Sequence, residues 1–504
     1  MEEVRMSGRL KNASKITTSV GATLGTILVV FSGALLVPLL VGLIGSEPPL
    51  PSLVAFTLPA AGCLLLGLSL CRAPKAPAIR TREAFLVCAL AWIITSFLGA
   101  FPIWLLVDNT TYLDALFEAV AGLTTTGMTM FTTPQQLPAS ILFWRAFMQF
   151  LGGLGILTFF LAVTFRRGVA QFHLFSAESA RLATPRLTPS ILRTVEIIAA
   201  IYLGLTAAFA VAYALAGMPI FDAMTHSMTS ISTGGFSTHG ASIDHFQRIG
   251  HPNHAAIEWL VIFGMLAGSV NFFAHYRLIR GEWRALWGSI EMRVFWLIIA
   301  LATVLIFIGT TTSLEPGDHL SLDRIRTVIF QVVAATSTGY RTESINAESF
   351  PPVARPVFLF LMFIGGPMGS TSGGLKVLRL VVLFQAARLQ LLRVCSPRRA
   401  VQPMLLEGQP VKPQRLSQAA GLMTLWLALI AGGTVISMLF TDHEFLSAAS
   451  GMLSAVSNMG PAYLSAQELV DMVPAVKITY ILGMLAGRLE IIPIVLLLSP
   501  RAWR

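Results

Sequence analysis

Long apolar runs dominate the sequence and alternate with short charged segments. Nine runs contain no Asp, Glu, Lys or Arg, and a tenth contains two such residues. Most of them reach the roughly 18–20 residues that an α-helix needs to cross a bilayer core. The runs cover residues 16–46, 48–71, 84–107, 146–165, 197–221, 259–276, 294–314, 356–375, 416–441 and 478–500. This pattern predicts ten spans and an all-α polytopic membrane protein.

A shorter apolar stretch follows the third, fifth, seventh and ninth runs, and each leads into a turn rich in Ser, Thr and Gly. Aligned on Gly127, Gly234, Gly339 and Gly460, the copies lie 107, 105 and 121 residues apart. A helix of about ten residues is roughly 15 Å long and reaches only halfway through a bilayer. The pattern therefore predicts four pseudo-symmetric units of span, pore helix and span around one pore, preceded by two extra N-terminal spans.

These units suggest a division of the chain into five parts. The expected boundaries are 1–80 for the N-terminal two-span region and 81–170, 189–285, 290–390 and 415–504 for pore repeats 1 to 4.

The turns have a specific chemistry. Non-helical backbone at membrane depth is tolerated only where it is buried in protein or lines a water-filled cavity. Four turns that face each other meet this condition, and their carbonyl oxygens can replace the hydration shell of a cation. Glycine suits such a turn because it permits positive φ and leaves no side chain in the opening. The predicted filter residues are Thr125, Thr126, Gly127, Ser232, Thr233, Gly234, Ser337, Thr338, Gly339, Asn458, Met459 and Gly460.

Composition and charge narrow the class of protein. The chain is 55% hydrophobic and only 12% charged, which excludes a water-soluble enzyme and makes a nucleic-acid partner a poor fit despite the net charge of +10. Of the 35 Lys and Arg residues, 26 fall in the termini and loops of one side and seven on the other. Because short basic loops stay in the cytoplasm, both termini are expected there, with the spans in the cytoplasmic membrane.

A glycine-rich segment interrupts the eighth run. Residues 365–374 contain five glycines, among them Gly369, Gly373 and Gly374, and Lys376 follows. Because a continuous helix would be costly there, a break or loop is expected. The alternative is a glycine surface for close helix packing. Arg488, deep in the last run, is expected to face the pore as an electrostatic barrier, or else to pair with an acid from another span.

Three segments together resemble the TrkH/TrkG/KtrB superfamily of potassium uptake proteins. They are residues 117–128, 365–376 and 483–490, and the resemblance covers about residues 80–500. It implies potassium-selective uptake through the four turns, with Gly127 favouring K⁺ over Na⁺, and an intramembrane gate formed by the glycine-rich segment. It also implies a homodimer and a cytosolic nucleotide-binding subunit of the TrkA/KtrA type. K⁺ is the transported ion, and no cofactor is expected on this chain. The fourth turn departs from the Thr-Gly form, so its role is the least defined.

Other functions compete with this interpretation. A secondary transporter coupled to H⁺ or Na⁺ would also use broken helices, but usually in paired inverted repeats. An enzyme is disfavoured because no HExxH spacing occurs, and His251, His254 and Glu258 are expected to be solvated. Glu118 and Asp222 are expected to pin filter turns.

Overall fold

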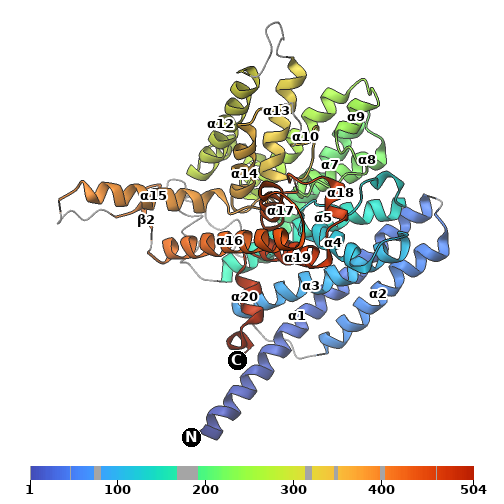
Figure 1. Ribbon diagram of the computed structural model, residues 1–504. Coiled ribbons are helices and arrows are strands. Elements are labelled where there is room, and N and C mark those ends of the chain that lie inside the picture. Colours follow the sequence, from blue (N-terminus) through green and yellow to red (C-terminus); the bar gives the residue numbers. More distant parts are fainter. Residues whose placement is uncertain are drawn as a thin grey trace.

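The computed structural model describes residues 2–45, 47–72, 81–166, 191–312, 321–345, 350–397, 403–411, 413–460 and 462–503. Nearly all the regular secondary structure in these residues is helical (Figure 1). Seven helices in this described part of the chain are long and apolar enough to cross a membrane, and two bent helix pairs also pass that test. They are α1 (Glu2–Ile44), α2 (Pro49–Cys71), α3 (Thr81–Leu106), α5 (Ala139–Arg166), α7 (Ile191–Leu215), α12 (Ile290–Thr312) and α16 (Pro413–Phe440). The expected all-α polytopic fold is confirmed.

Each predicted pore helix is present as a separate, buried element. These helices are α4 (Tyr112–Leu123), α8 (Ile220–Ile231), α13 (Leu322–Ser337) and α17 (Phe445–Ser457). The N-terminus of α4 is fixed by a capping box, in which Thr111 and Asp114 each accept a hydrogen bond from the other's backbone N–H. Ser321 caps α13 in the simpler way, by accepting from Arg324 N. The pore helices therefore start at defined residues.

The remaining spans are interrupted, two of them where the sequence predicted continuous helices. The sixth predicted span is α10 (His254–Ser269) followed by α11 (Phe272–Ile279), bent by 105°. The bend arises because Asn271 caps α11 and Gly369 O accepts a hydrogen bond from Phe272 N. The last is α19 (Pro474–Arg488) followed by α20 (Ile492–Leu498), bent by 114°, with positive φ at Glu490 and Ile491. The expected break in the eighth span lies between α14 (Ala354–Ile364) and α15 (Val377–Val394).

The smaller elements lie in loops and at the C-terminal end of the chain. They are η1 (Pro134–Gln136), α9 (Asp244–Arg248), η2 (Trp283–Leu286), the β1 (Leu405–Leu406) and β2 (Gln409–Pro410) hairpin, α18 (Ala466–Val470) and η3 (Pro500–Trp503).

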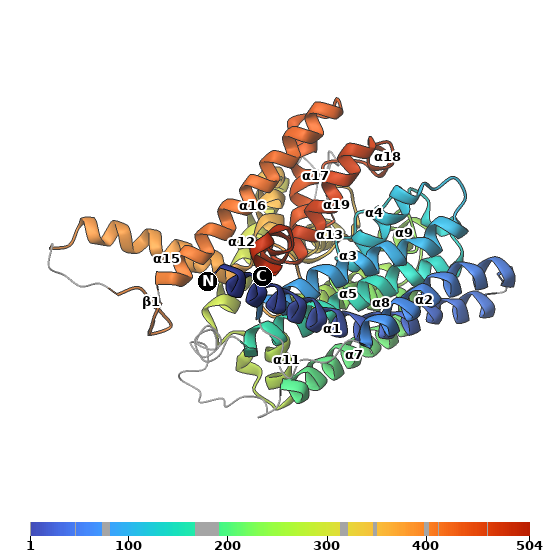
Figure 2. The same ribbon diagram turned by 90° about the horizontal axis from the view of Figure 1, so that it is seen from below.

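The arrangement places the pore helices inside, with several of the long helices around them on the outside. In Figure 1 α17 and α19 lie at the centre, the α1–α2 hairpin packs along one side, and α15 projects away from the body. Figure 2 shows from below that α15 projects away from the body. The long helices α7 and α12 are only 22% buried over their most apolar windows. Their exposed apolar side chains, such as Leu203 and Leu297, suit contact with lipid.

Candidate ion pathway

The four turns after the pore helices meet at one place. A Cβ atom added to Gly339 would lie 3.4 Å from the Cα atoms of both Gly127 and Gly460. A Cβ on Gly460 would lie 2.5 Å from Gly339 Cα, and one on Gly127 would overlap Gly234 O. Backbone from all four turns therefore packs around a common centre in which no side chain fits.

Three turns share one backbone conformation. Thr125, Thr233 and Asn458 all have φ of 54–55°, and two residues later Gly127, Gly235 and Gly460 have φ of 81–85°. In the second turn the counterpart of Gly127 is thus Gly235, one residue beyond the glycine used in the sequence alignment. Gly234 takes the place of Thr126. Because Gly234 and Gly235 are adjacent, the sequence alone could not show which of them corresponds to Gly127. The positive φ of Gly235 identifies it as the counterpart.

The third turn differs from the other three. Helix α13 continues through Ser337, and Thr338 is extended with φ of −138°. Gly339 does not adopt positive φ. The third turn therefore reaches the centre along a straighter path, with Gly339 still against Gly127 and Gly460.

The unusual fourth turn is explained by the side chain of Asn458. Asn tolerates the left-handed conformation better than most residues. Its Nδ2 donates to Thr126 Oγ1 at 2.9 Å and to Met484 O at 3.0 Å. Asn458 therefore ties the fourth turn to the first one and to α19.

On the outer side of the turns, the first unit is held by a buried ion pair. Arg145 Nε lies 2.6 Å from Glu118 Oε1, and the two side chains are 2% and 0% exposed. Glu118 Oε2 accepts a hydrogen bond from Met130 N at 2.7 Å. This carboxylate pins the chain that leaves the first turn, as the sequence suggested for Glu118.

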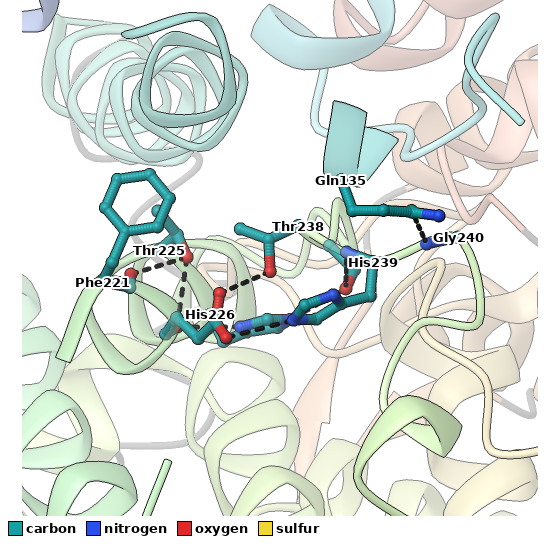
Figure 3. Close-up of polar contacts among 9 residues, drawn as sticks. Gln135, Phe221, Thr225, His226, Thr238, His239 and Gly240 are labelled. Carbon is teal, nitrogen blue, oxygen red and sulfur yellow. Dashed lines mark hydrogen bonds and ion pairs between the residues drawn. The ribbon is translucent and has the colours of Figure 1, made fainter. Parts of the chain in front are cut away.

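The second unit is held by a different set of side chains (Figure 3). Asp222 accepts from Thr238 Oγ1 at 2.7 Å and lies 3.0 Å from His239 Nε2. His226 bonds Asp222 O at 2.8 Å and Ser237 Oγ at 2.9 Å. The ring of His245, in the outer loop, stacks on His239 with centroids 3.6 Å apart. Burial and the charge of His239 lower the pKa of His245.

The third and fourth units differ in whether a pore-helix side chain holds the chain that leaves the turn. In the fourth, Ser450 Oγ accepts a hydrogen bond from Tyr463 N at 2.8 Å. In the third, Gln331 is 1% exposed, and neither atom of its amide has a partner among the described residues. Among the described residues, helix α13 therefore supplies no such pin, and the exit of the third turn is held instead from the second unit, where Ser242 Oγ accepts a hydrogen bond from Arg341 N at 3.2 Å.

A cavity lies on each side of the turns. The first, of about 340 Å³, is lined by Gly127, Gly235, Gly339 and Gly460 together with outer-loop residues. The second, of about 430 Å³, is lined by Gly369, Gly373, Lys376, Asn458 and Arg488. We call them the outer and inner cavities, following the sides that the basic loops predict.

Residues 365–376, which we call the gate loop after the role expected from the sequence, line the inner cavity together with Asn458 of the fourth turn. Positive φ at Gly365, Gly369 and Gly374 shows why glycine is needed. The loop donates hydrogen bonds to the C-terminal carbonyls of α8, α13 and α17, from Thr371 Oγ1, Ser372 Oγ and Gly374 N, respectively.

The two deep cations are bonded to this loop. Arg488, 4% exposed, donates to Thr371 O at 2.9 Å and to Gly152 O at 3.3 Å. Lys376 Nζ donates to Ser372 O. Among the residues that the structure describes, no acid from another span pairs with Arg488, and Glu490 pairs with Arg379 at 2.6 Å. The side chain of Arg488 therefore holds the gate loop through a backbone carbonyl of the loop. The sequence did not reveal this contact.

Several other positioning residues were also missed from sequence. Trp92 Nε1 donates to Leu123 O, at the end of α4, at 3.3 Å. Gln149 Oε1 accepts from Phe236 N at 3.1 Å behind the second turn. Glu291 accepts a hydrogen bond at 2.7 Å from Met368 N, which belongs to the gate loop. Such residues carry no sequence motif, because their roles depend on contacts between distant segments.

The expectation that Glu258 is solvated was wrong. Glu258 is 1% exposed and lies 2.6 Å from Arg326 Nε on α13. Charge alone suggested a solvated loop, but α10 begins at His254 and carries this residue into the protein interior. The pair joins the second and third units.

The fold and this pathway define a polytopic membrane transport protein. A family model described as "Cation transport protein", TrkH, matches residues 60–503. The chain belongs to this TrkH family, and it is a transporter rather than an enzyme. It is 34% identical over 490 residues to the "Trk system potassium uptake protein TrkH" of Salmonella typhimurium, with 95% of this chain and 98% of that protein covered.

Further similarities agree. The Escherichia coli K12 "Trk system potassium uptake protein TrkH" is 33% identical over 493 residues, with 95% and 98% covered. The crystal structure of the "Potassium Transporter TrkH" from Vibrio parahaemolyticus matches with a TM-score of 0.83 and 30% identity, covering 97% of this chain and 99% of that one.

Proposed function

We propose that this protein mediates potassium-selective uptake across the cytoplasmic membrane through the four turns, with the gate loop as its intramembrane gate. The observation that carries the proposal is the convergence of four glycine-containing turns between two cavities. Main-chain oxygens at such a centre can replace the water around an alkali cation. The names of the relatives, potassium uptake protein and potassium transporter, support K⁺ as the ion.

The selective residues in this proposal are those of the turns. They comprise Thr125, Thr126 and Gly127; Ser232, Thr233, Gly234 and Gly235; Ser337, Thr338 and Gly339; and Asn458, Met459 and Gly460. Positive φ directs the choice of Gly235 over Gly234 as the counterpart of Gly127. The first and fourth turns act together, because Asn458 bonds Thr126.

The gate in this proposal is the loop with its two cations. Gly369, Gly373 and Gly374 supply the backbone freedom, and Lys376 and Arg488 place positive charge in the inner cavity. A cation crossing this region meets both electrostatic repulsion and a backbone obstruction. Displacement of the loop would relieve the obstruction.

Regulation is assigned to a cytosolic nucleotide-binding subunit of the TrkA/KtrA type, and assembly to a homodimer. The chain contains no GxxxxGK[ST] phosphate-binding motif, so a nucleotide would act through another chain. Helix α15 projects from the body and carries exposed apolar side chains, including Phe384 (70% exposed) and Val394 (85%). These features support contact between α15 and another subunit.

Ion flux into liposomes bearing the purified protein tests the function. We expect uptake of K⁺ and Rb⁺ well above that of Na⁺, without a requirement for a pH gradient. Uptake that depends on an imposed H⁺ or Na⁺ gradient would favour the coupled secondary transporter. Equal uptake of K⁺ and Na⁺ would contradict a selective filter in the four turns.

A further inference from the structure

We propose that the C-terminal carbonyls of α8, α13 and α17 form a monovalent cation site on the inner side of the filter, and that the gate loop fills this site when closed. The inference rests on the proposed function, since it takes the loop as the gate. It adds that the loop and the transported ion compete for the same oxygen atoms.

The hydrogen bonds of the loop carry the argument. The loop places one donor on the end of each of three pore helices. The pairs are Thr371 Oγ1 to Ile231 O at 2.9 Å, Ser372 Oγ to Thr336 O at 2.8 Å, and Gly374 N to Ser457 O at 2.8 Å. All three accepting residues are at most 1% exposed. Three donors within four residues of chain therefore reach three separate helices.

The acceptors are of the kind that binds cations. The last carbonyls of a helix have no partner within the helix and carry the partial negative charge of its C-terminal end. In the closed arrangement hydroxyl and amide hydrogens supply the matching positive charge. An alkali cation can satisfy the same oxygens, because carbonyl groups replace its water ligands. Withdrawal of the loop would leave these oxygens without donors, facing the inner cavity.

The first pore helix is different. Leu123 O, at the end of α4, accepts its hydrogen bond from Trp92 Nε1, which belongs to the long helix α3. This donor does not depend on the gate loop. The proposed site therefore consists of the ends of α8, α13 and α17, which the loop can release. It excludes the end of α4, which the loop does not hold.

The glycines keep these helix ends accessible. A Cβ on Gly373 would overlap Ser457 O, and one on Gly268 would lie 2.6 Å from Ile231 O. Larger residues there would cover the carbonyls permanently. Close backbone approach without side chains is thus what allows the loop, and then an ion, to reach these oxygens.

The charges near the loop favour one occupant at a time. Arg488 binds Thr371 O and Lys376 binds Ser372 O, so the closed loop brings two positive charges to the site. These charges repel a cation while the loop is in place. Because Lys376 is part of the loop, its movement removes one of them. K⁺ in the inner cavity is therefore expected to favour the open position.

Accessibility of a single cysteine tests this competition. We would place Ser370→Cys in a background lacking Cys63, Cys71, Cys88 and Cys395, because Ser370 is 5% exposed and lines the inner cavity. Its rate of reaction with a water-soluble thiol reagent is measured in K⁺ and in choline, without any partner subunit. The rate should rise with K⁺ concentration and remain low in choline.

Three variants make the test specific. Thr371→Val removes the hydroxyl donor that Ile231 O shares with Gly268 O at 3.0 Å. It should lower the K⁺ concentration for half-maximal reaction by about two- to tenfold, the value of one hydrogen bond. Thr371→Ser keeps the donor and should match the parent. The control Thr310→Val removes a buried hydroxyl that bonds only within α12, at Ile306 O, and should leave the K⁺ dependence unchanged.

The outcomes separate the two proposals. Equal labelling in K⁺ and choline, in a protein that takes up K⁺ into liposomes, would overturn the shared site and leave the proposed function standing. The same result for Thr371→Val and Thr310→Val would also overturn it. Absence of selective K⁺ uptake by the parent protein would instead contradict the proposed function itself.

Discussion

The outer and inner sides of the four filter turns are held by different chemistry. On the outer side, Glu118 with Arg145 and Glu258 with Arg326 form buried ion pairs, both at 2.6 Å. On the inner side, neutral donors of the gate loop hold three of the pore helices. Breaking a buried ion pair is costly, whereas a neutral hydrogen bond exchanges readily with water or an ion. The difference suits the proposed function, in which the filter keeps its shape while its inner support is released.

The largest expected effect comes from the outer side. Arg145→Met leaves Glu118 buried without its cation and should destabilise the protein by about 3–5 kcal/mol, because an unpaired buried charge is strongly unfavourable. Thermal unfolding of the purified protein measures the change. Glu118→Gln combined with Arg145→Met should recover part of the loss.

A matched exposed pair provides the control for this prediction. Arg277 and Glu282 lie 2.8 Å apart with side chains 24% and 45% exposed. Arg277→Met should cost at most about 1 kcal/mol. If Arg145→Met lowers stability no more than Arg277→Met does, the buried pair of Arg145 and Glu118 does not hold the outer side of the turns rigidly.

The next effect concerns the turns themselves. Gly127→Ser forces a side chain into a position with φ of +81° and against Gly234 O, at a cost of about 1–3 kcal/mol. Competition between K⁺ and Na⁺ for uptake should show weaker discrimination. Retained discrimination would place the selective ring elsewhere.

The second turn sharpens this prediction. A Cβ on Gly235 would overlap Gly339 N, whereas one on Gly234 meets the flexible amide of Gln149. Gly235→Ala should therefore reduce K⁺ selectivity more than Gly234→Ala. The reverse order would favour the alignment made from sequence.

On the inner side, Arg488→Ala should raise cation flux severalfold without changing the ratio of K⁺ to Na⁺. It removes both the charge in the inner cavity and the hydrogen bond to Thr371 O, which is made by a charged donor and is worth about 1.5–3 kcal/mol. Liposome flux provides the measurement. Arg388→Ala, on the exposed part of α15, serves as the control, and equal flux in both variants would argue against the barrier.

A smaller effect is expected at the one inner helix end held by a spanning helix. Trp92→Phe removes the donor to Leu123 O and should lower stability by about 0.5–1.5 kcal/mol. The K⁺ dependence of Ser370→Cys labelling should not change. If Trp92→Phe changes the K⁺ dependence of labelling as much as Thr371→Val does, the end of α4 is not held independently of the gate loop.

The smallest effect concerns pH on the outer side. Because the pKa of His245 lies below its usual value near 6.5, the folded protein binds fewer protons than the unfolded chain as pH falls below that value. Stability should therefore fall slightly between neutral and mildly acidic pH. His245→Asn should flatten this part of the thermal unfolding profile, and an unchanged slope would exclude His245 as its source.

Sequence patterns predicted the parts of this molecule that repeat. Apolar runs and the recurring Ser/Thr-Gly turns located the spans, the four pore helices and the interruption after Ile364. Each of these depends on local composition and length. The bends after Ser269 and Arg488 were missed, because Phe272 and Gly369 meet only in three dimensions and positive φ at Ile491 has no local signature.

The residues of the candidate site also fall into those that local sequence patterns predicted and those that only the structure revealed. Gly127 and Gly460 were identified by spacing, but the choice between Gly234 and Gly235 required backbone angles. The bond between Arg488 and Thr371 joins residues 117 positions apart, and no periodicity predicts such a pair. Supporting residues such as Trp92 contribute a single side-chain donor, which composition cannot distinguish from an ordinary apolar residue.

The bond between Asn458 and Thr126 spans 332 positions, and that between Lys477 and Asp114 spans 363. The ribosome therefore finishes most of the chain before either bond can form. Until the last unit enters the bilayer, the polar turns of the earlier units lack the neighbour that completes their ring. Biogenesis of this protein thus calls for some temporary shelter of those turns, and a nascent chain that stops before Asn458 should be a target for membrane proteolysis.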